Sequence, residues 1–300
     1  MVERLWVMDS RVVQEIAEVR SQVAAWRREG KRIGFVPTMG YLHEGHLSLM
    51  RQVLSCCDRL VVSIFVNPTQ FGPTEDLSAY PRDLAGDLAK IRSVGEALVF
   101  FPSVEAMYPQ GAQTFVEVME VTQPLCGVSR PIHFRGVATV VCKLFLIVQP
   151  DVAIFGEKDF QQLVTIRQMV RDLRFPVEVL GGSIVREADG LAMSSRNAYL
   201  DPDQRMAARA LSRAITEARL SFAAGERDVR RLLGVARAIL ESTSGIEIDY
   251  VEVREPVALR AVEGETKPED RLFVAVYLGR ARLIDNAPLG GACGLPPVSA

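Results

Sequence analysis

The sequence predicts an α/β protein with a doubly wound parallel sheet and a second, smaller α+β domain. Two features predict the sheet: short, continuous apolar runs, and segments of helical periodicity between these runs. A change of pattern near residue 186 predicts the second domain. With 300 residues, of which 48% are hydrophobic, the chain is long enough for one large core or for two domains.

Five apolar runs are expected to form the strands of the sheet. They span 33–37, 60–66, 97–101, 151–155 and 177–185. Between them, apolar residues recur at helical spacing, most clearly at 47–57 and 160–173. Alternation of strand and helix favours a parallel sheet, in which ligands bind beyond the carboxyl ends of the strands. Most of the runs end in a polar or Gly/Pro cluster, so we expect the site to be assembled from these clusters.

After residue 186 the pattern changes to helices followed by strands. Helices are expected near 203–223 and 226–242, and strands at 246–254, 271–278 and 281–284. Asp201-Pro202 is typical of a helix start, and Gly279-Arg280 of a tight turn between strands. We therefore divide the chain into residues 1–186, a smaller domain at 187–287, and a Gly- and Pro-rich tail at 288–300 that is expected to be disordered.

Charge and composition argue against several classes of protein. The formal net charge is −2 and no stretch is strongly one-signed, whereas nucleic-acid-binding proteins usually carry a basic patch, so we expect no nucleic-acid partner. The five cysteines show no regular spacing, and the first residues lack a secretory signal, which favours a cytoplasmic location. The longest apolar stretch, 137–148, is too short to span a bilayer, so we expect no membrane association.

The first candidate site follows the apolar run at 33–37. The segment PTMGYLHEGH (37–46) leads from a strand into a helix. His43 and His46 can face the same way, and the helix N-terminus offers unpaired N–H groups to a phosphate, which Gly45 allows to approach closely. The residues alone favour phosphate binding, but they leave open a structural role and a zinc site built on the two histidines.

Two further segments carry cations that suit a triphosphate. MSSRN (193–197) offers two hydroxyls and the guanidinium of Arg196, although in isolation it is more typical of a surface loop. Lys158, in FGEKD (155–159), stands just inside a helix start, where the helix dipole disfavours a cation. Because the chain has only five lysines, this position favours anion binding, with a solvated Lys-Asp pair as the alternative.

Amide and carboxylate side chains form the last candidate group. Gln70, in NPTQFG (67–72), and Gln162 can hydrogen-bond a small polar acid, unless they are simply solvated. Asp87 can hold Mg²⁺ together with phosphates and water, or pair with an arginine on a helix surface. The chain lacks the GxxxxGK[ST], GxGxxG and GxSxG motifs, so a P-loop, a dinucleotide site and a hydrolase elbow are not expected.

Read in order, these segments resemble one family. PTMGYLHEGH, SIFVNPTQF, YPRDL, HFRGVATVV, FGEKDFQQ and GLAMSSRN, followed by VYLGRARLIDN, are similar in order and spacing to the motifs of the pantothenate synthetase family. The resemblance runs from about residue 33 to residue 197 and continues at 276–286. The HxGH element alone would indicate only the wider nucleotidyltransferase superfamily.

The resemblance implies a fold and a reaction. It implies a Rossmann-like N-terminal domain, a smaller domain that closes over the site, and a homodimer. It also implies the ATP-dependent, AMP-forming condensation of (R)-pantoate with β-alanine through a pantoyl adenylate, with Mg²⁺ as cofactor. A related nucleotidyltransferase and a nucleotide-binding regulator on the same fold are the alternatives.

The same resemblance implies residue roles. The catalytic residues, which would hold the phosphates of ATP, are His43, His46, Lys158, Ser194, Ser195 and Arg196. The other ATP contacts would be Met39, Gly156, Asp159 and Met193. The pantoate pocket would be formed by Pro37, Met39, Gln70 and Gln162, and Asp87 would bind Mg²⁺. The chain has Ile132 where the family commonly has glycine, and Gly86 leaves Asp87 as the one carboxylate where some members have two.

Overall fold

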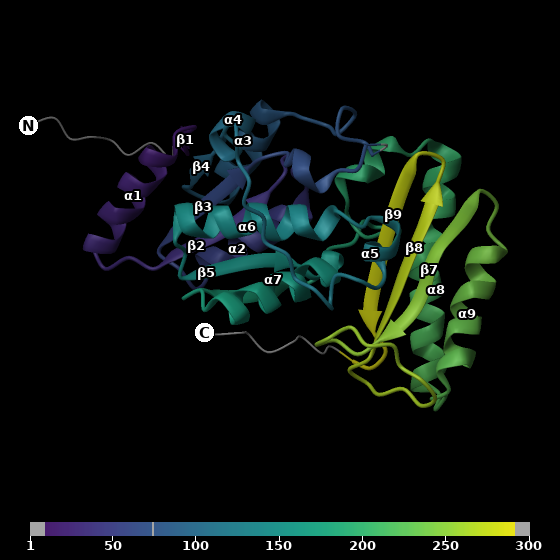
Figure 1. Ribbon diagram of the computed structural model, residues 1–300. Helices are drawn as coiled ribbons and strands as arrows, with labels where there is room; N and C mark the ends of the chain where they lie inside the picture. Colours follow the sequence, from purple (N-terminus) through teal and green to yellow (C-terminus); the bar gives the residue numbers. More distant parts are fainter. Residues whose placement is uncertain (1–9, 74, 292–300) are drawn as a thin grey trace, which may run out of the picture.

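Two packed domains make up the computed structural model, which describes residues 10–73 and 75–291 (Figure 1). The large domain carries a sheet with helices on both faces. The small domain carries an antiparallel sheet backed by two long helices. The predicted combination of an α/β domain and a smaller α+β domain is confirmed.

The large domain is built on a six-stranded parallel sheet of order β1-β4-β3-β2-β5-β6. Its strands are β1 (Arg11–Val13), β2 (Ile33–Thr38), β3 (Arg59–Ile64), β4 (Leu98–Phe100), β5 (Val152–Gly156) and β6 (Glu178–Gly182). All five predicted strands are present. The additional strand β1 is a short edge strand, and three residues give no periodic signal in the sequence.

Helices cover both faces of this sheet. They are α1 (Ile16–Arg28), α2 (Glu44–Leu54), α3 (Leu84–Val94), α4 (Val104–Met107), α5 (Cys126–Ser129), α6 (His133–Val148) and α7 (Phe160–Leu173). In β2, Phe35 packs in the core formed with α1, α6 and α7, whereas Val36 packs in the core formed with α2 and α3. Burial on both faces explains why the strands are continuous apolar runs.

The small domain packs two antiparallel helices on a three-stranded sheet of order β7-β8-β9. Its elements are α8 (Pro202–Ala223), α9 (Val229–Glu241), β7 (Ile246–Arg254), β8 (Arg271–Leu278) and β9 (Ala281–Pro288). The carboxylate of Asp201 caps α8 by accepting from the N–H of Gln204, and Pro202 occupies the first turn, as predicted. Gly279 has φ +57°, as the tight turn between β8 and β9 requires.

The small domain extends further along the chain than its predicted end at 287. Strand β9 continues to Pro288, and Leu289 is buried, with its N–H donating to the carbonyl of Asp270 at 2.8 Å. Backbone pairing therefore includes the start of the predicted tail in the domain. The rest of that tail, 292–300, lies outside the described residues.

Polar contacts join the two domains. Arg186 forms a two-point ion pair with the buried carboxylate of Asp285, at 2.6 and 3.0 Å. Arg271 of β8 reaches Glu157 of the large domain at 3.2 Å. The carboxyl end of β5 is thus held directly by the small domain.

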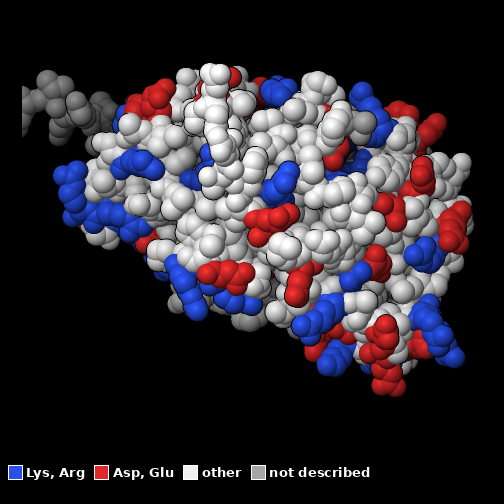
Figure 2. All heavy atoms as spheres, viewed as in Figure 1, with Lys and Arg blue, Asp and Glu red and all other residues white. Residues whose placement is uncertain are grey.

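The face of the molecule shown in Figure 2 carries side chains of both charges. Basic and acidic side chains are interspersed on this face, between wide areas of uncharged residues. Within the part of the chain that the structure describes, no helix is long and apolar enough to cross a membrane.

Candidate active site

The predicted site residues converge on a cavity of about 220 Å³ at the carboxyl edge of the parallel sheet. Thirteen of the fourteen line it: Pro37, Met39, His43, His46, Gln70, Gly156, Lys158, Asp159, Gln162, Met193, Ser194, Ser195 and Arg196. They come from the ends of β2 and β5, from the start of α2, from α7, from the 3₁₀ helices η1 (Pro68–Gln70), η2 (Glu157–Asp159) and η3 (Ser195–Tyr199), and from the residues just before η3. Segments far apart in the sequence therefore form one wall, as expected for a parallel sheet.

A second cavity, of about 500 Å³, adjoins the first between the two domains. The two cavities share Lys158, Asp159 and Arg196 as lining residues. The small domain closes the far side of this second cavity with Tyr250, Tyr277, Arg280, Arg282 and Asn286. The cleft as a whole is thus lined by residues of both domains.

The hydrogen bond between the backbone of His43 and the ring of His46 decides which tautomer a neutral His46 adopts. The N–H of His43, just before α2 begins, donates to Nδ1 of His46 at 3.2 Å. Since Nδ1 accepts, the proton of a neutral His46 ring must sit on Nε2. The two rings lie 4.1 Å apart between centroids, and Nδ1 of His43 is buried without a partner among the described residues. Both rings therefore keep polar atoms available for a ligand.

Burial keeps both imidazoles neutral. Burial, assisted by the nearby cation of Lys158, lowers the pKa of His43 to about 4. Burial also lowers the pKa of His46 well below its ordinary value, assisted by His43 and Lys158. At neutral pH the two rings can donate a hydrogen bond to an anion without carrying a charge themselves.

Gly45 leaves the space that the ring of His43 occupies. A Cβ at position 45 would lie 2.9 Å from both Cε1 and Nδ1 of this ring. The next atom that it would meet is the Cβ of Met193, at 3.9 Å. Any side chain larger than hydrogen would therefore displace His43.

Lys158 is positioned by the small domain. The side-chain amide of Asn286 donates to the backbone carbonyls of Glu157 and Lys158, at 3.0 and 2.9 Å. The Lys158 side chain is only 18% exposed, and its Nζ lies 3.8 Å from the Asp159 carboxylate. Sequence reasoning did not single out Asn286; the one signal was its place in the family-like segment 276–286.

The 194–196 segment also belongs to the cleft rather than to a free surface. Ser195 is buried, and its hydroxyl donates to the carbonyl of Tyr41 at 3.1 Å. Ser194 Oγ accepts from the N–H of Arg196 at 3.3 Å. The guanidinium of Arg196 pairs with Asp76 through two contacts of 3.2 and 3.1 Å. A bound phosphate would have to compete with this carboxylate.

Amides form the opposite wall of the smaller cavity. Asn67 is 1% exposed, and its Nδ2 donates to Oε1 of Gln70 at 3.0 Å. Nε2 of Gln70 then faces Met39, 3.2 Å from its sulfur. The orientation of the Gln70 amide is thus fixed from behind by Asn67, a residue that the sequence placed in the right segment without assigning it a role.

The backbone at Ile132 does not require the glycine that is common in the family. Ile132 has φ −93° and ψ −11°, a conformation that any residue adopts. His133, which follows it, is buried, and its Nδ1 lies 3.0 Å from the carbonyl of Gln70. Arg130 pairs with Glu75 on the rim of the cleft. Ile132 therefore leaves the course of this segment intact.

Asp87 is the one predicted site residue that lies apart from the cleft. It is 1% exposed and lines a different cavity, of about 310 Å³, behind the loop that precedes α2. Its oxygens accept from the N–H groups of Tyr41, at 2.8 Å, and Leu42, at 2.6 Å. No cluster of three or more His, Cys, Asp or Glu among the described residues is placed to hold a metal. A buried carboxylate whose two oxygens already accept from backbone N–H groups does not fit a direct Mg²⁺ ligand. The metal role of Asp87 therefore stays a prediction.

Burial of the histidines predicts a loss of stability in mild acid. The folded-state pKa of His43 is lowered to about 4 and that of His133 to about 3, against 6.5 for a free histidine. Below about pH 6.5 the unfolded chain therefore binds more protons than the folded chain. The free energy of unfolding should fall by up to about 1.4 kcal/mol per pH unit for each such histidine.

Urea unfolding at about pH 7 and about pH 5 measures this effect. The midpoint should move to lower urea at the lower pH, and the shift should be smaller in His133→Gln, which cannot take up the proton. Equal midpoints at both pH values would contradict the assignment of buried neutral histidines.

Comparisons with known proteins identify the family to which this fold belongs. The sequence model of the family described as pantoate-beta-alanine ligase matches residues 11–288. The pantothenate synthetase of Syntrophobacter fumaroxidans is 56% identical over 279 residues, covering 93% of this chain and 98% of that protein. The crystal structure of pantothenate synthetase from Thermus thermophilus superposes with a TM-score of 0.88 at 47% identity, covering 93% of this chain and 99% of that one.

A second solved structure is informative because of its ligands. Pantoate-beta-alanine ligase from Francisella tularensis, complexed with beta-gamma ATP and beta-alanine, has a TM-score of 0.76 at 32% identity and covers 93% of this chain and 98% of that one. Matches of this extent, in both sequence and structure, show common descent over nearly the whole length. The chain belongs to the pantoate–β-alanine ligase family.

Proposed function

We propose that this enzyme condenses (R)-pantoate with β-alanine, using ATP and releasing AMP and pyrophosphate, by way of an enzyme-bound pantoyl adenylate. The observation that carries the proposal is the convergence of His43, His46, Lys158 and the 194–196 segment on one cleft beside a pocket lined by amides. Family membership supports it. So does the related Francisella tularensis ligase, which was solved with beta-gamma ATP and beta-alanine.

Adenylate formation brings two anions together. The carboxylate of pantoate attacks the α-phosphorus of ATP and pyrophosphate leaves, so the residues of the cleft must offset repulsion and stabilise charge on the leaving oxygens. Nε2–H of His46 and the ring of His43 donate to phosphate oxygens, while Lys158 and Arg196 supply positive charge. Such preorganised donors lower the barrier because they need no reorientation during the reaction.

The two ends of the adenylate take different walls of the cleft. Pro37, Met39, Gln70 and Gln162 bind the pantoate part, with the Gln70 amide aligned by Asn67 for a hydroxyl or carboxylate oxygen. The nucleotide lies along Gly156, Asp159 and Met193, which line the same cavity, and the carboxylate of Asp159 accepts from the ribose hydroxyls.

The attack of the β-alanine amine needs an acceptor for its proton. The acidic side chains that line the larger cavity are Glu75, Asp76, Asp159 and Asp285. Three of them are engaged in ion pairs with arginines, and Asp159 lies near Lys158. We therefore assign the proton to the phosphate of the departing AMP rather than to a carboxylate base.

Magnesium stays a predicted cofactor that would enter with the phosphates of ATP and neutralise part of their charge. Homodimeric assembly and a cytoplasmic location also stay predictions. The large apolar side chains of Phe115 and Met119 are 52% and 65% exposed and lie four residues apart on one irregular segment. Their exposure supports a surface that a second subunit covers.

An AMP-release assay with pantoate, with and without β-alanine, tests the reaction. Steady AMP formation should require both acids, because the adenylate stays bound until the amine attacks it. Release of a nucleotide-containing product without any amine would instead indicate a nucleotidyltransferase. ATP binding without pyrophosphate release from either mixture would indicate a regulator.

Replacing His46 tests the phosphate-binding histidines. His46→Ala should lower the rate of adenylate formation at least ~10²-fold, because one preorganised donor to the transition state is lost. Glu44→Gln, in the same helical turn but pointing to the surface, is the matched control and should retain the parent rate. An unchanged rate in a folded His46→Ala protein would remove His46 from the mechanism.

Gly45→Ala separates activity from stability. The new Cβ displaces the His43 ring, so adenylate formation should fall by roughly 10- to 100-fold. Stability should change little, because the advantage of alanine over glycine in a helix, up to about 1 kcal/mol, opposes the cost of moving the His43 ring. Gly234→Ala in α9 is the control, since nothing lies within 4 Å of the position that its new methyl group would take, and it should keep full activity. Full activity of Gly45→Ala would show that the position of the His43 ring is not critical.

A further inference from the structure

The loop between β2 and α2 is held from behind by α3. The side chain of Asp87, in the first turn of α3, is buried and receives two backbone hydrogen bonds from this loop. Its Oδ2 accepts from Tyr41 at 2.8 Å and its Oδ1 from Leu42 at 2.6 Å. The two oxygens of one carboxylate thus accept hydrogen bonds from two consecutive peptide N–H groups immediately before His43.

A second residue of α3, Lys90, also hydrogen-bonds the loop. Lys90 lies three positions after Asp87, on the same helix face. Its Nζ donates to the carbonyl of Leu42 at 2.8 Å and lies 5.9 Å from the centre of the Tyr41 ring. Leu42 is therefore fixed by an acceptor at its N–H and by a donor at its carbonyl.

The loop needs such support because its backbone is unusual. Gly40 has φ +82° and Tyr41 has φ +51°, and a tyrosine adopts this left-handed region only when its surroundings enforce it. Space is also limited, since a Cβ at position 40 would lie 3.0 Å from Oδ2 of Asp87 and 3.0 Å from Cγ2 of Ile64.

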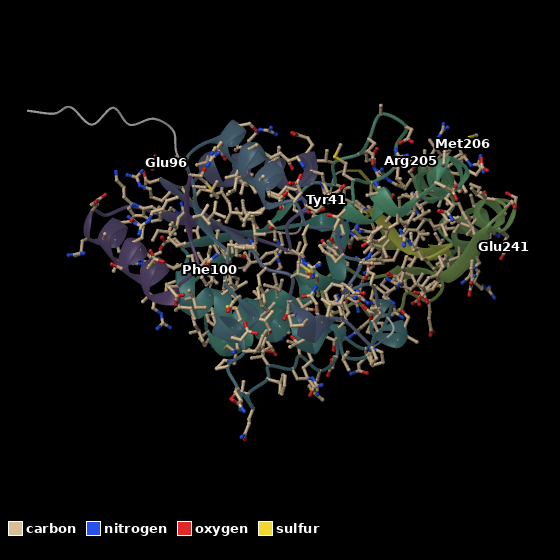
Figure 3. The ribbon with its side chains drawn as sticks, turned by 90° about the horizontal axis from the view of Figure 1, so that it is seen from above. Tyr41, Glu96, Phe100, Arg205, Met206 and Glu241 are labelled. Atoms are coloured by element: carbon tan, nitrogen blue, oxygen red, sulfur yellow. The ribbon has the colours of Figure 1, made fainter. Side chains whose placement is uncertain are left out.

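The same loop connects α3 to the opposite wall of the cleft. Tyr41 is labelled in Figure 3, on the side of the large domain that faces the small one. Its carbonyl accepts from the hydroxyl of Ser195, whereas its N–H donates to Asp87. A shift of this peptide would move the start of α2, and with it His43 and His46, relative to the 194–196 segment.

We propose that Asp87, assisted by Lys90, is a positioning residue that fixes the turn at 40–42 and so aims His43 and His46 into the cleft, and that it does not bind Mg²⁺ directly. The burial of Asp87, the occupation of both its oxygens and its place outside the cleft carry this assignment. The proposal rests on the proposed adenylation for its kinetic consequence, but not for its structural one.

Asp87→Asn is the central variant. An amide has one accepting oxygen, so its NH₂ group must face one of the two N–H donors of the loop, and the turn loses its fixed course. The rate of adenylate formation at saturating magnesium should fall roughly 10- to 100-fold. The magnesium concentration for half-maximal activity should stay within about twofold of the parent value, because no ligand of the ion is lost.

Two further variants control for charge and for folding. Asp83→Asn removes the same charge from the start of the same helix and keeps an N-cap side chain, so it should leave both parameters unchanged. Lys90→Met keeps the carboxylate and loses one donor, so it should lower the rate in the same sense by less. It also keeps the proposal testable if Asp87→Asn does not fold.

A readout that does not use the reaction is the NMR spectrum of the histidine rings in the free, magnesium-free protein. The ring signals of His43 and His46 should shift in Asp87→Asn and in Lys90→Met, and should stay in place in Asp83→Asn. These shifts are expected even if the AMP-release assay fails, so the two proposals can fail separately. Unchanged ring signals and rate in folded Asp87→Asn would overturn the positioning role. A tenfold or greater rise in the half-maximal magnesium concentration, with the rate restored at saturation, would show instead that Asp87 is a metal ligand.

Discussion

The hydrogen bond from the backbone of His43 to Nδ1 of His46 is the interaction on which the site depends. It fixes the tautomer of His46, so that the remaining ring N–H can donate to an anion. It exists only because the chain enters α2 at His43 with an extended backbone, φ −135° and ψ 175°. That entry depends in turn on the left-handed turn at Gly40 and Tyr41 and on the space that Gly45 leaves for a ring.

Both domains contribute to this arrangement. The small domain places Ser195 on the carbonyl of Tyr41 and the amide of Asn286 on the carbonyls of the turn that carries Lys158. The cations and the histidines thus reach one cleft through contacts that cross the domain boundary. A site of this kind cannot be assigned to either domain alone, although the sheet that orients most of it belongs to the first.

Much of this could be predicted from the sequence, for physical reasons. Two-sided burial makes parallel strands read as apolar runs, and polar clusters at their ends must meet at one edge, so the fold and most of the cleft were accessible. Strand β1 was not, because three residues carry no periodicity. Asn67 and Asn286 act through backbone carbonyls and a neighbouring amide, and such partners leave no mark on sequence spacing.

Asp87 is a residue whose role the sequence could not settle, although its type was informative. Its residue type suits a metal, and only the burial of its carboxylate and the two loop N–H groups reveal that its oxygens are already used. The sequence shows which groups a side chain carries. Only the structure shows which of these groups already have hydrogen-bond partners within the protein.

The ion pair between Arg196 and Asp76 has a consequence for which anions the cleft can hold. Because the guanidinium fork is already filled by a carboxylate through two contacts, an incoming anion must replace both of them. Chloride offers a single point of contact and gains nothing by the exchange. A polyphosphate offers several oxygens and a higher charge, and Lys158 lines the same cavity as Arg196. An anion that binds Arg196 must therefore replace both contacts with Asp76, so the strength of this ion pair sets the minimum affinity that such a ligand needs.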